Sequence, residues 1–330
     1  MLSQYTVTSL AVAPVIDLGP NKDIILGFYF AFLIIGGNVG LPLLITTLLV
    51  TKTVNRRHPT LINFLISWTV YGSTCLILLY AGEQGQEAPR FDICLAQASL
   101  FYGSISGGAV ATLCLVLQLW LDIKSRKKLG NPRLMIGLLL IAPWAFFSFF
   151  TILALVVGIR EPSLVTRKWV FYCTVSSNYI VFSASAVGLV VMALVLVFQG
   201  LIHHFLYKCG RARAVDQSTF RLYIRVSIFT FFAVLFFVVD IVTVFVPTHP
   251  AVYIIFSLVP LSVFLGFGIH KENFRIWFRI PRRRDGRANS RHFTLSTSHS
   301  KSADPSTATD KDDTNKSLPP VPRSHNDIHV

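Results

Sequence analysis

Seven apolar stretches divide this chain, and each is about as long as a helix that crosses a lipid bilayer. Such a helix needs about 20 mostly apolar residues to cover the hydrocarbon core. All 30 Lys and Arg residues lie outside the seven stretches. We therefore expect seven membrane-spanning helices, at residues 24–50, 61–81, 94–121, 134–158, 178–198, 226–246 and 251–269.

The distribution of positive charge predicts how these helices are oriented. The N-terminus and the even-numbered connections hold five Lys or Arg residues, whereas the odd-numbered connections and the tail hold 25. Because cationic residues stay on the cytoplasmic side, we expect the N-terminus outside and the C-terminus in the cytoplasm. The expected location is the plasma membrane, as a multi-pass integral membrane protein.

The net charge of +14 would favour nucleic acid binding in a soluble protein. Here 53% of the residues are apolar and only 14% are charged, which excludes an ordinary soluble domain. The charge is also confined to the connections and the tail. We therefore expect the lipid bilayer as a partner and no nucleic acid.

The expected fold class is an all-α membrane protein, a seven-helix transmembrane bundle at residues 24–270. Residues 1–23 form a short extracellular N-terminus. Residues 271–280 should form a short amphipathic eighth helix on the inner membrane surface, because its aromatic and arginine side chains fall on different helix faces. Residues 281–330 are rich in Ser, Thr, Asp and Pro and should form a disordered cytoplasmic tail.

The third stretch should be the central helix of the bundle. It carries a small residue at every fourth position, namely Ser99, Gly103, Gly107 and Ala111. Small residues leave a flat helix face on which the backbone of a neighbouring helix can approach closely. This close approach is how helices associate in lipid, where apolar side chains gain little by leaving the solvent.

Polar residues inside the stretches should face other helices. Asn63, Ser67 and Tyr71 recur at every fourth position of the second stretch, so they share one face, which we expect to point inward. Asn38 lies near the middle of the first stretch. An amide at this depth is costly unless it bonds another helix or a water molecule.

Two of the five cysteines, Cys94 and Cys173, fall on the outer, oxidising side of the membrane. A disulfide between them would hold the outer loop 159–177 over the mouth of the bundle. It would close a loop of about 80 residues and stabilise the fold by about 4 kcal/mol. No third outer-loop cysteine competes for the pairing, and two unrelated thiols are the alternative.

Asp240 is the acidic residue that lies within an apolar stretch. With no Lys or Arg at membrane depth, it is either protonated and hydrogen-bonded to neighbours, or balanced by a ligand, an ion or an outer-loop cation. Other polar residues in the outer halves of the stretches could line the same cavity, with ordinary interhelical hydrogen bonding as the alternative for each: Tyr102, Gln97, Ser183, Tyr253 and Ser257. We take these six as candidate ligand-binding residues.

The inner side carries residues that cytoplasmic partners could contact. The third stretch continues into a basic segment whose candidate G-protein contacts are Asp122, Lys124, Arg126, Lys127 and Lys128. Charge that only sets the topology is the alternative for this segment.

The tail also carries residues that could bind partners. It holds thirteen Ser or Thr residues after Pro281, which predicts kinases as partners. The proline cluster at 317–323 is a weak signal for a polyproline-binding domain.

Three further features point to one family. The basic loop around Arg56 leads into the second stretch, Gly37 precedes Asn38, and Phe274-Arg275 follows the seventh stretch. With the two outer cysteines, these features resemble the seven-transmembrane G-protein-coupled receptors over residues 24–280, specifically the fungal receptor-like proteins of mushroom-type basidiomycetes.

The resemblance implies a seven-helix receptor fold that couples to heterotrimeric G proteins, with Cys94 and Cys173 as its outer disulfide. It implies no particular ligand. Leu121-Asp122-Ile123 stands where rhodopsin-type receptors have an acid-arginine-tyrosine motif, and the sixth stretch lacks a Trp-x-Pro motif. From the overall architecture we predict a cell-surface receptor that transmits an unknown extracellular signal to cytoplasmic G proteins.

Rival functions lack their characteristic residues. A retinal protein of the microbial kind needs a Schiff-base lysine in its last span, and none occurs there. All nine histidines lie in loops, at span edges or in the tail, which argues against a zinc hydrolase. We expect no enzyme, no cofactor and no metal site.

The alternative to a receptor is a small-solute transporter or another non-signalling membrane protein. Many transporters are built from internal repeats, and the two halves of this sequence show no such repeat.

Overall fold

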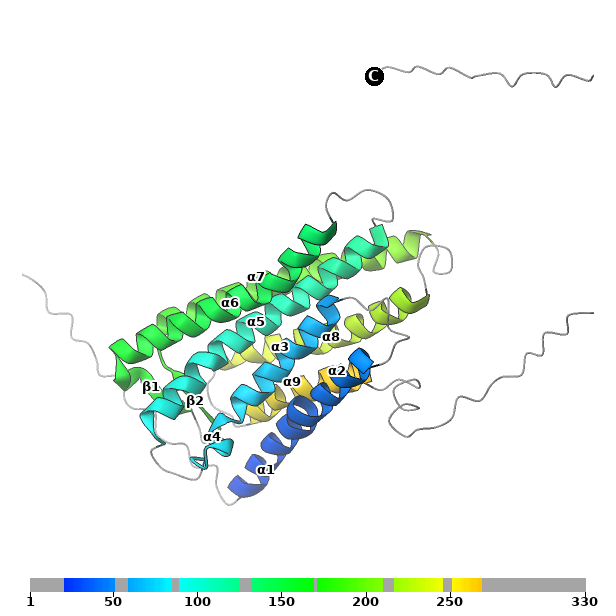
Figure 1. Cartoon of the computed structure of the whole chain (residues 1–330). Coiled ribbons are helices and arrows are strands. Elements are labelled where there is room, and N and C mark those ends of the chain that lie inside the picture. The colour runs from blue at the N-terminus through cyan, green and yellow to red at the C-terminus, as the bar shows by residue number, and fades with distance from the viewer. Residues whose placement is uncertain are drawn as a thin grey trace, which may run out of the picture. The chain divides into compact units, whose positions relative to one another are not determined.

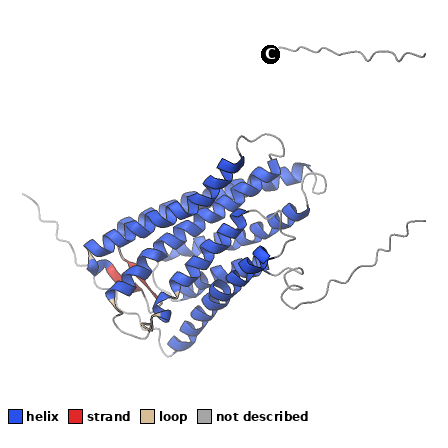
Figure 2. Cartoon of the chain, in the orientation of Figure 1, coloured by secondary structure: helices blue, strands red, loops and turns tan. Residues whose placement is uncertain are grey.

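The computed structural model describes residues 21–50, 59–84, 89–124, 132–168, 171–209, 217–245 and 251–268. These residues are mostly helical, with two short strands at one end of the bundle (Figures 1 and 2). The helices are α1 (Lys22–Phe32), the π-helix η2 (Leu33–Gly40), α2 (Leu41–Val50), α3 (Pro59–Cys75), α4 (Ile77–Tyr80), α5 (Phe91–Lys124), α6 (Pro132–Arg160), α7 (Asn178–Cys209), α8 (Gln217–Phe245) and α9 (Ala251–Gly268).

Helices overlap all of the predicted stretches, but their ends and continuity differ. The second stretch was wrongly predicted as one helix, because the chain breaks at Leu76 between α3 and α4. α7 continues to Cys209, beyond the predicted end at residue 198. Hydropathy locates only the part of a helix that lies in hydrocarbon, and a helix can continue into the polar interface. The predicted segments 271–280 and 281–330 lie outside the described residues.

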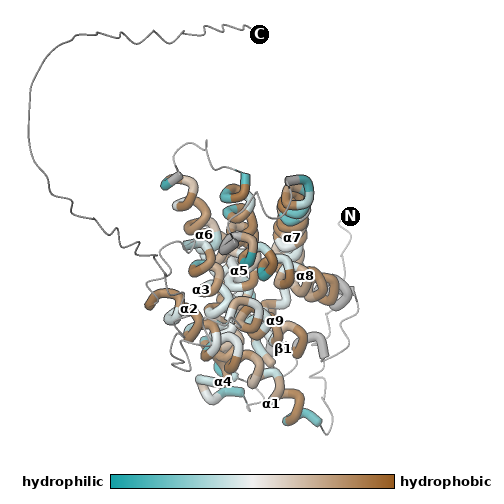
Figure 3. Tube along the Cα trace, turned by 90° about the vertical axis from the view of Figure 1, so that its right-hand side faces the viewer, coloured by the Kyte–Doolittle hydropathy of each residue, from teal (hydrophilic) through white to brown (hydrophobic). Residues whose placement is uncertain are grey.

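Five described helical segments are long and apolar enough to cross a membrane: Lys22–Val50, Phe91–Lys124, Arg133–Arg160, Asn178–Lys208 and Phe220–Val239. The apolar windows of α6 and α7 are each only 17% buried within the protein. Their apolar surface is therefore left for lipid, and hydrophilic residues gather at helix ends (Figure 3). These are the features of an all-α integral membrane protein.

α5 is the central helix, as the sequence predicts. Its apolar window is 72% buried, and it contacts α3, α4, α6, α7 and α8 (Figure 1). Its small-residue face packs on α6. A Cβ atom added at Gly103 would lie 2.7 Å from the carbonyl oxygen of Phe147, which is closer than a real Cβ atom can approach.

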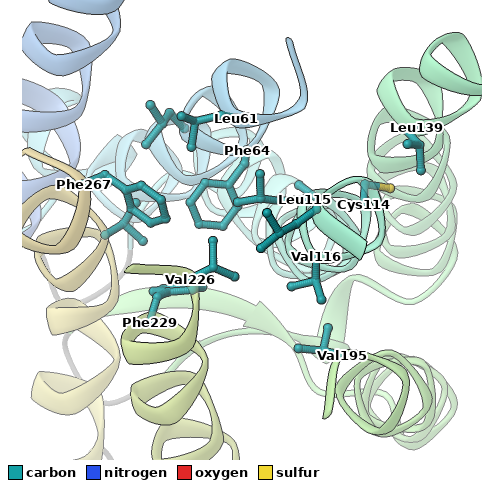
Figure 4. Packing of buried hydrophobic residues seen from close by; sticks show 14 of the residues in the cluster. Leu61, Phe64, Cys114, Leu115, Val116, Leu139, Val195, Val226, Phe229 and Phe267 are labelled. Atoms are coloured by element: carbon teal, nitrogen blue, oxygen red, sulfur yellow. The ribbon is translucent and has the colours of Figure 1, made fainter. Parts of the chain in front are cut away.

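A cluster of aromatic and aliphatic side chains fills the bundle core around Phe64 of α3. The Phe64 ring lies edge-on to Phe229 of α8, with 5.3 Å between the ring centroids, and 5.5 Å from Phe267 of α9. Figure 4 shows Phe64 between Phe267 and Leu115 of α5. One fully buried ring therefore joins four helices.

The inward face predicted for α3 is confirmed, since Asn63, Ser67 and Tyr71 are all buried. The Asn63 amide nitrogen donates to the carbonyl oxygen of Leu140 at 3.1 Å, and the indole nitrogen of Trp144 donates to the Asn63 amide oxygen at 2.8 Å. Asn63 thus holds α3 against α6, beside the proline at position 143 that interrupts the hydrogen bonding of α6.

Asn38 also bonds a neighbouring helix, as its depth requires. Ser73 of α3 donates to the Asn38 amide oxygen at 3.0 Å, and the Asn38 amide nitrogen donates to the hydroxyl of Tyr80. The surrounding residues form the π-helix η2, where Gly36 packs directly on the backbone of Leu261 in α9. The first stretch is therefore attached to α3 by polar contacts and to α9 by close packing.

We expect Gly103→Ala to lower the melting temperature of the detergent-solubilised protein. The new methyl group would overlap Thr151 and the Phe147 carbonyl group, so α5 and α6 would have to separate. Such overpacking costs about 1–3 kcal/mol.

Gly137→Ala in α6 is the matched control, because nothing lies within 4 Å of an added Cβ atom there. This change should be neutral or slightly stabilising, since Ala favours a helix over Gly by about 1 kcal/mol. Equal melting temperatures for the two variants would contradict the close packing of α5 on α6.

Candidate functional site

The connection between α6 and α7 contains a β-hairpin that the sequence patterns do not predict. We call the end of the bundle that carries this hairpin the outer end, after the orientation predicted from the charges, and the opposite end the inner end. Strands β1 (Val165–Lys168) and β2 (Tyr172–Val175) are antiparallel, with Val165 opposite Val175. A 3₁₀ turn, η4 (Pro162–Leu164), precedes β1, and the backbone N–H of Ser176 donates to the Leu164 carbonyl oxygen at 2.8 Å. The β-branched residues of both strands are the signal that could have revealed the hairpin.

The predicted disulfide between Cys94 and Cys173 is confirmed. It joins the first turn of α5 to β2, with 5.2 Å between the Cα atoms and a sequence separation of 79. Both cysteines are buried. The hairpin is therefore covalently attached to the central helix of the bundle.

Gln97 joins three elements beneath the disulfide. The backbone N–H of Cys173 donates to the Gln97 amide oxygen at 2.9 Å, and the Gln97 amide nitrogen donates to the carbonyl oxygens of Thr74 and Cys75, each at 3.2 Å. These carbonyl groups lie at the end of α3, where a helix leaves acceptors without partners in the next turn. Because Gln97 is fully buried, all of these bonds are shielded from water.

Tyr102 holds the second half of β2. Its hydroxyl group donates to the carbonyl oxygen of Val175 at 3.0 Å and lies 2.9 Å from the hydroxyl oxygen of Thr174. The structure therefore brings Gln97 and Tyr102 together around β2, where both position the hairpin. Their binding of a ligand stays a prediction.

Aromatic side chains at the start of β2 pack at the outer end of the bundle. Phe171 is fully buried, and its ring centroid lies 4.7 Å from that of Tyr29 in α1. Tyr172 stacks on Phe101 of α5, with 4.3 Å between centroids and 29° between ring planes. We call the whole group the outer aromatic cluster; its members are Tyr29, Leu33, Tyr71, Cys75, Leu76, Phe101, Phe171 and Tyr172.

The sequence patterns do not predict the outer aromatic cluster. Its signal is the pair of aromatic residues directly before Cys173, which a disulfide would draw toward the bundle. The candidate ligand site predicted from the sequence is centred on Asp240 instead. The side chains of Asp240 and Tyr253 lie outside the described part of the structure.

The two remaining candidate ligand residues bond within their own helices. Ser183 of α7 is partly buried and donates to the Ile180 carbonyl oxygen at 3.0 Å. Ser257 of α9 is buried and donates to the Ile254 carbonyl oxygen at 2.7 Å. Side chains that bond their own backbone need no other partner, so these contacts leave the predicted ligand role of both residues open.

At the inner end, Asp122 and Lys124 lie in the last turn of α5, and Arg126, Lys127 and Lys128 lie outside the described residues. The Lys124 amine is 5.3 Å from the centroid of the Trp120 ring, a cation–π contact. That ring packs edge-on against Phe205 of α7, with 6.3 Å between centroids. The inner end of α5 is therefore connected to α7.

Two polar contacts connect α7 with α8 near the same end. The imidazole Nδ1 of His203 lies 3.1 Å from the Tyr223 hydroxyl oxygen, and the amide nitrogen of Gln199 donates to the Ser227 hydroxyl oxygen. Within the described ranges, no three His, Cys, Asp or Glu side chains are grouped closely enough to hold a metal ion.

No protein-family model matches the sequence, and no curated protein matches it significantly. The assignment of a function therefore depends on the geometry of the outer hairpin and of the helices that hold it.

We expect Cys94→Ala and Cys173→Ala each to abolish most surface expression. Loss of a disulfide that closes a loop of this length costs about 2–5 kcal/mol, which is a large part of the stability of a typical domain. Surface biotinylation measures the effect. Cys114→Ala, which removes a buried free thiol of α5, should keep the protein at the surface. Two outer thiols that can be alkylated in the wild-type protein would contradict the disulfide.

We expect Tyr102→Phe to destabilise the hairpin by about 1–3 kcal/mol, because the Val175 carbonyl group loses its buried donor. Thermal unfolding and limited proteolysis of the outer loop measure this change. Tyr179→Phe is the control, since Tyr179 is 89% exposed and should tolerate the loss of its hydroxyl group. Equal proteolysis of both variants would show that Tyr102 does not hold the hairpin.

Proposed function

We propose that this chain is a seven-span receptor of the plasma membrane, similar to G-protein-coupled receptors, which passes an extracellular signal to cytoplasmic G proteins. The observation that carries the proposal is the outer hairpin, which is attached covalently to the central helix and whose residues Phe171 and Tyr172 pack at the outer end of the bundle. In a receptor built this way, a movement of the hairpin would change the conformation of the inner end of the bundle.

The length of α5 supports transmission across the membrane. At about 1.5 Å per residue, its 34 residues span about 51 Å, whereas the hydrocarbon core is about 30 Å thick. One continuous helix therefore runs from the hairpin at its outer end to Lys124 at its inner end. A movement of the hairpin would therefore move α5 relative to α3, α6 and α7, which all contact α5.

The inner contacts support a second packing of α7 and α8. The bonds His203–Tyr223 and Gln199–Ser227 connect the two helices through polar side chains, and a different packing of the helices would break these bonds. A ligand that favours one of two packings shifts their populations by its difference in affinity for them. The basic residues of the inner loops would then be presented differently to a G protein.

The orientation follows from the charges. The described helices overlap all seven predicted spans, and the excess of Lys and Arg in the odd-numbered connections supports a cytoplasmic C-terminus. The hairpin then lies outside, where its disulfide is stable. The tail would be available to kinases and to polyproline-binding domains.

The test is a screen for G-protein activation in cells that express the full chain, read out as nucleotide exchange on G-protein α subunits. We expect candidate ligands from the screen to raise the exchange rate. Asp240→Asn should lower the potency of such a ligand by about tenfold, since a hydrogen bond to a charged group contributes about 1.5–3 kcal/mol. Asp23→Asn, at the exposed start of α1, is the matched control and should respond like the wild type.

An unchanged response of Asp240→Asn would remove this residue from the ligand site. Purified protein that moves a solute across liposome membranes, without any effect on nucleotide exchange, would instead favour the transporter alternative.

A further inference from the structure

Three polar side chains form a cluster on the surface of the bundle, where η2 packs on α3 (Figure 1). The Asn38 amide of η2 bonds the hydroxyl groups of Ser73 in α3 and Tyr80 in α4. The Ser73 hydroxyl also bonds the carbonyl oxygen of Thr69 at 3.0 Å. Tyr80 is 62% exposed, and Asn38 and Ser73 are half-buried. We call Asn38, Ser73 and Tyr80 the lateral polar cluster.

The lateral polar cluster has more donor hydrogens than hydrogen bonds. The Asn38 amide supplies two hydrogens, and the hydroxyl groups of Ser73 and Tyr80 supply one each, which makes four. Among the described residues, these side chains make three hydrogen bonds, which join Asn38 to Ser73, Asn38 to Tyr80 and Ser73 to Thr69. At least one hydrogen is therefore left for an acceptor from outside the chain, whichever way round the amide group lies.

The lateral polar cluster lies close to the outer boundary of the hydrocarbon. The exposed ion pair of Arg90 with Asp92 marks the polar interface at this end, and Glu83, which follows α4, accepts from the backbone N–H of Arg90 at 3.3 Å. Tyr80 ends α4, and helical side chains lean toward the helix N-terminus, so Tyr80 leans back into the membrane. Ser73 lies about 10 Å deeper than Tyr80, at about 1.5 Å per residue. A lipid group at this boundary is therefore within reach of the cluster.

The surroundings of the cluster leave it open toward the lipid. Behind it, η2 and α3 are in backbone contact, since a Cβ atom added at Gly37 would lie 3.1 Å from the Cα atom of Gly72. Beside it, Ile35 and Val39 of η2 are 54% and 58% exposed. Their β-branched side chains are stiff and form a fixed apolar surface. A ligand for the cluster therefore combines one oxygen acceptor with an apolar body.

We propose that the lateral polar cluster binds the hydroxyl group of a membrane sterol, whose ring system lies against Ile35 and Val39. The sterol oxygen accepts the hydrogen that the cluster leaves unpaired, so a donor that is costly in hydrocarbon is satisfied. The site requires only that the chain lies in a membrane. It is therefore independent of the proposed receptor function.

Other lipid-side partners fit the cluster less well. A charged headgroup would lose its hydration without gaining a cationic partner, because the cluster holds an amide and two hydroxyl groups. A phospholipid ester also carries an acceptor oxygen, but a flexible acyl chain loses more conformational freedom on a fixed surface than a rigid ring system does. A second copy of the chain would meet the branched side chains of Ile35 and Val39, whereas helices that associate closely in lipid do so through small residues.

The experiment uses the full chain in phospholipid nanodiscs that contain a photoactivatable cholesterol with its hydroxyl group intact, and peptide mass spectrometry locates the label. We expect the labelling of the segments around Asn38 and Tyr80 to saturate as the sterol fraction rises. Unlabelled cholesterol should reduce this labelling at least about fivefold. Cholestane, which has the same ring system without the hydroxyl group, should not.

Val39→Trp should lower the labelling at least about fivefold, because the larger side chain covers the apolar surface beside the cluster. Val197→Trp in α7 is the matched control, since Val197 is 56% exposed and belongs to a different helix, and it should label like the wild type. A single gel-filtration peak establishes that each variant is folded. If Val39→Trp aggregates, Ile35→Trp decides by the same readouts.

Three outcomes would overturn the proposal. Labelling that rises in proportion to the sterol fraction would show that the surface does not distinguish a sterol from phospholipid. Equal competition by cholesterol and cholestane would show that the cluster does not bind the hydroxyl group. A dimer that cross-links through the segment around Asn38, without saturable labelling, would assign the surface to a second copy of the chain.

Discussion

Close packing of α5 against its neighbours is the contact on which the rest of the structure depends. In lipid, apolar side chains gain little by leaving the solvent for a protein interface, so helices associate through van der Waals contact and hydrogen bonds. The absence of a side chain at Gly103 lets α5 approach the backbone of α6 near Phe147. This approach places α5 where its outer end can hold β2 and its inner end can contact α7.

Hydrogen bonds then fix how the helices are rotated. An unsatisfied polar group in hydrocarbon costs several kcal/mol, so a buried amide specifies one arrangement of its neighbours. Asn63 bonds both the backbone and Trp144 of α6, Asn38 bonds α3 through Ser73, and Gln97 bonds β2 and α3 at once. The hydrogen-bond partners of each of these side chains lie on an element other than its own. A small number of polar residues therefore fixes how several helices are rotated.

The sequence could predict the helices, the disulfide and the inward faces, because each depends on local composition or on a pairing with one candidate partner. It could not predict the break at Leu76 or where the hairpin packs on the bundle, since both depend on contacts with Gln97 and Tyr102 that are distant in sequence. For the same reason the sequence leaves two interpretations open for these two residues, a place in the wall of a ligand cavity or ordinary interhelical hydrogen bonding. Polarity at membrane depth indicates that a side chain needs a partner, but it does not distinguish a ligand from a neighbouring strand.

The disulfide determines which helix a movement of the hairpin would reach first. Cys173 ties β2 to α5, and α5 contacts α3, α4, α6, α7 and α8. Because helices packed through small residues and buried hydrogen bonds have few ways to rearrange, a displacement of α5 would change its contacts with several helices at once.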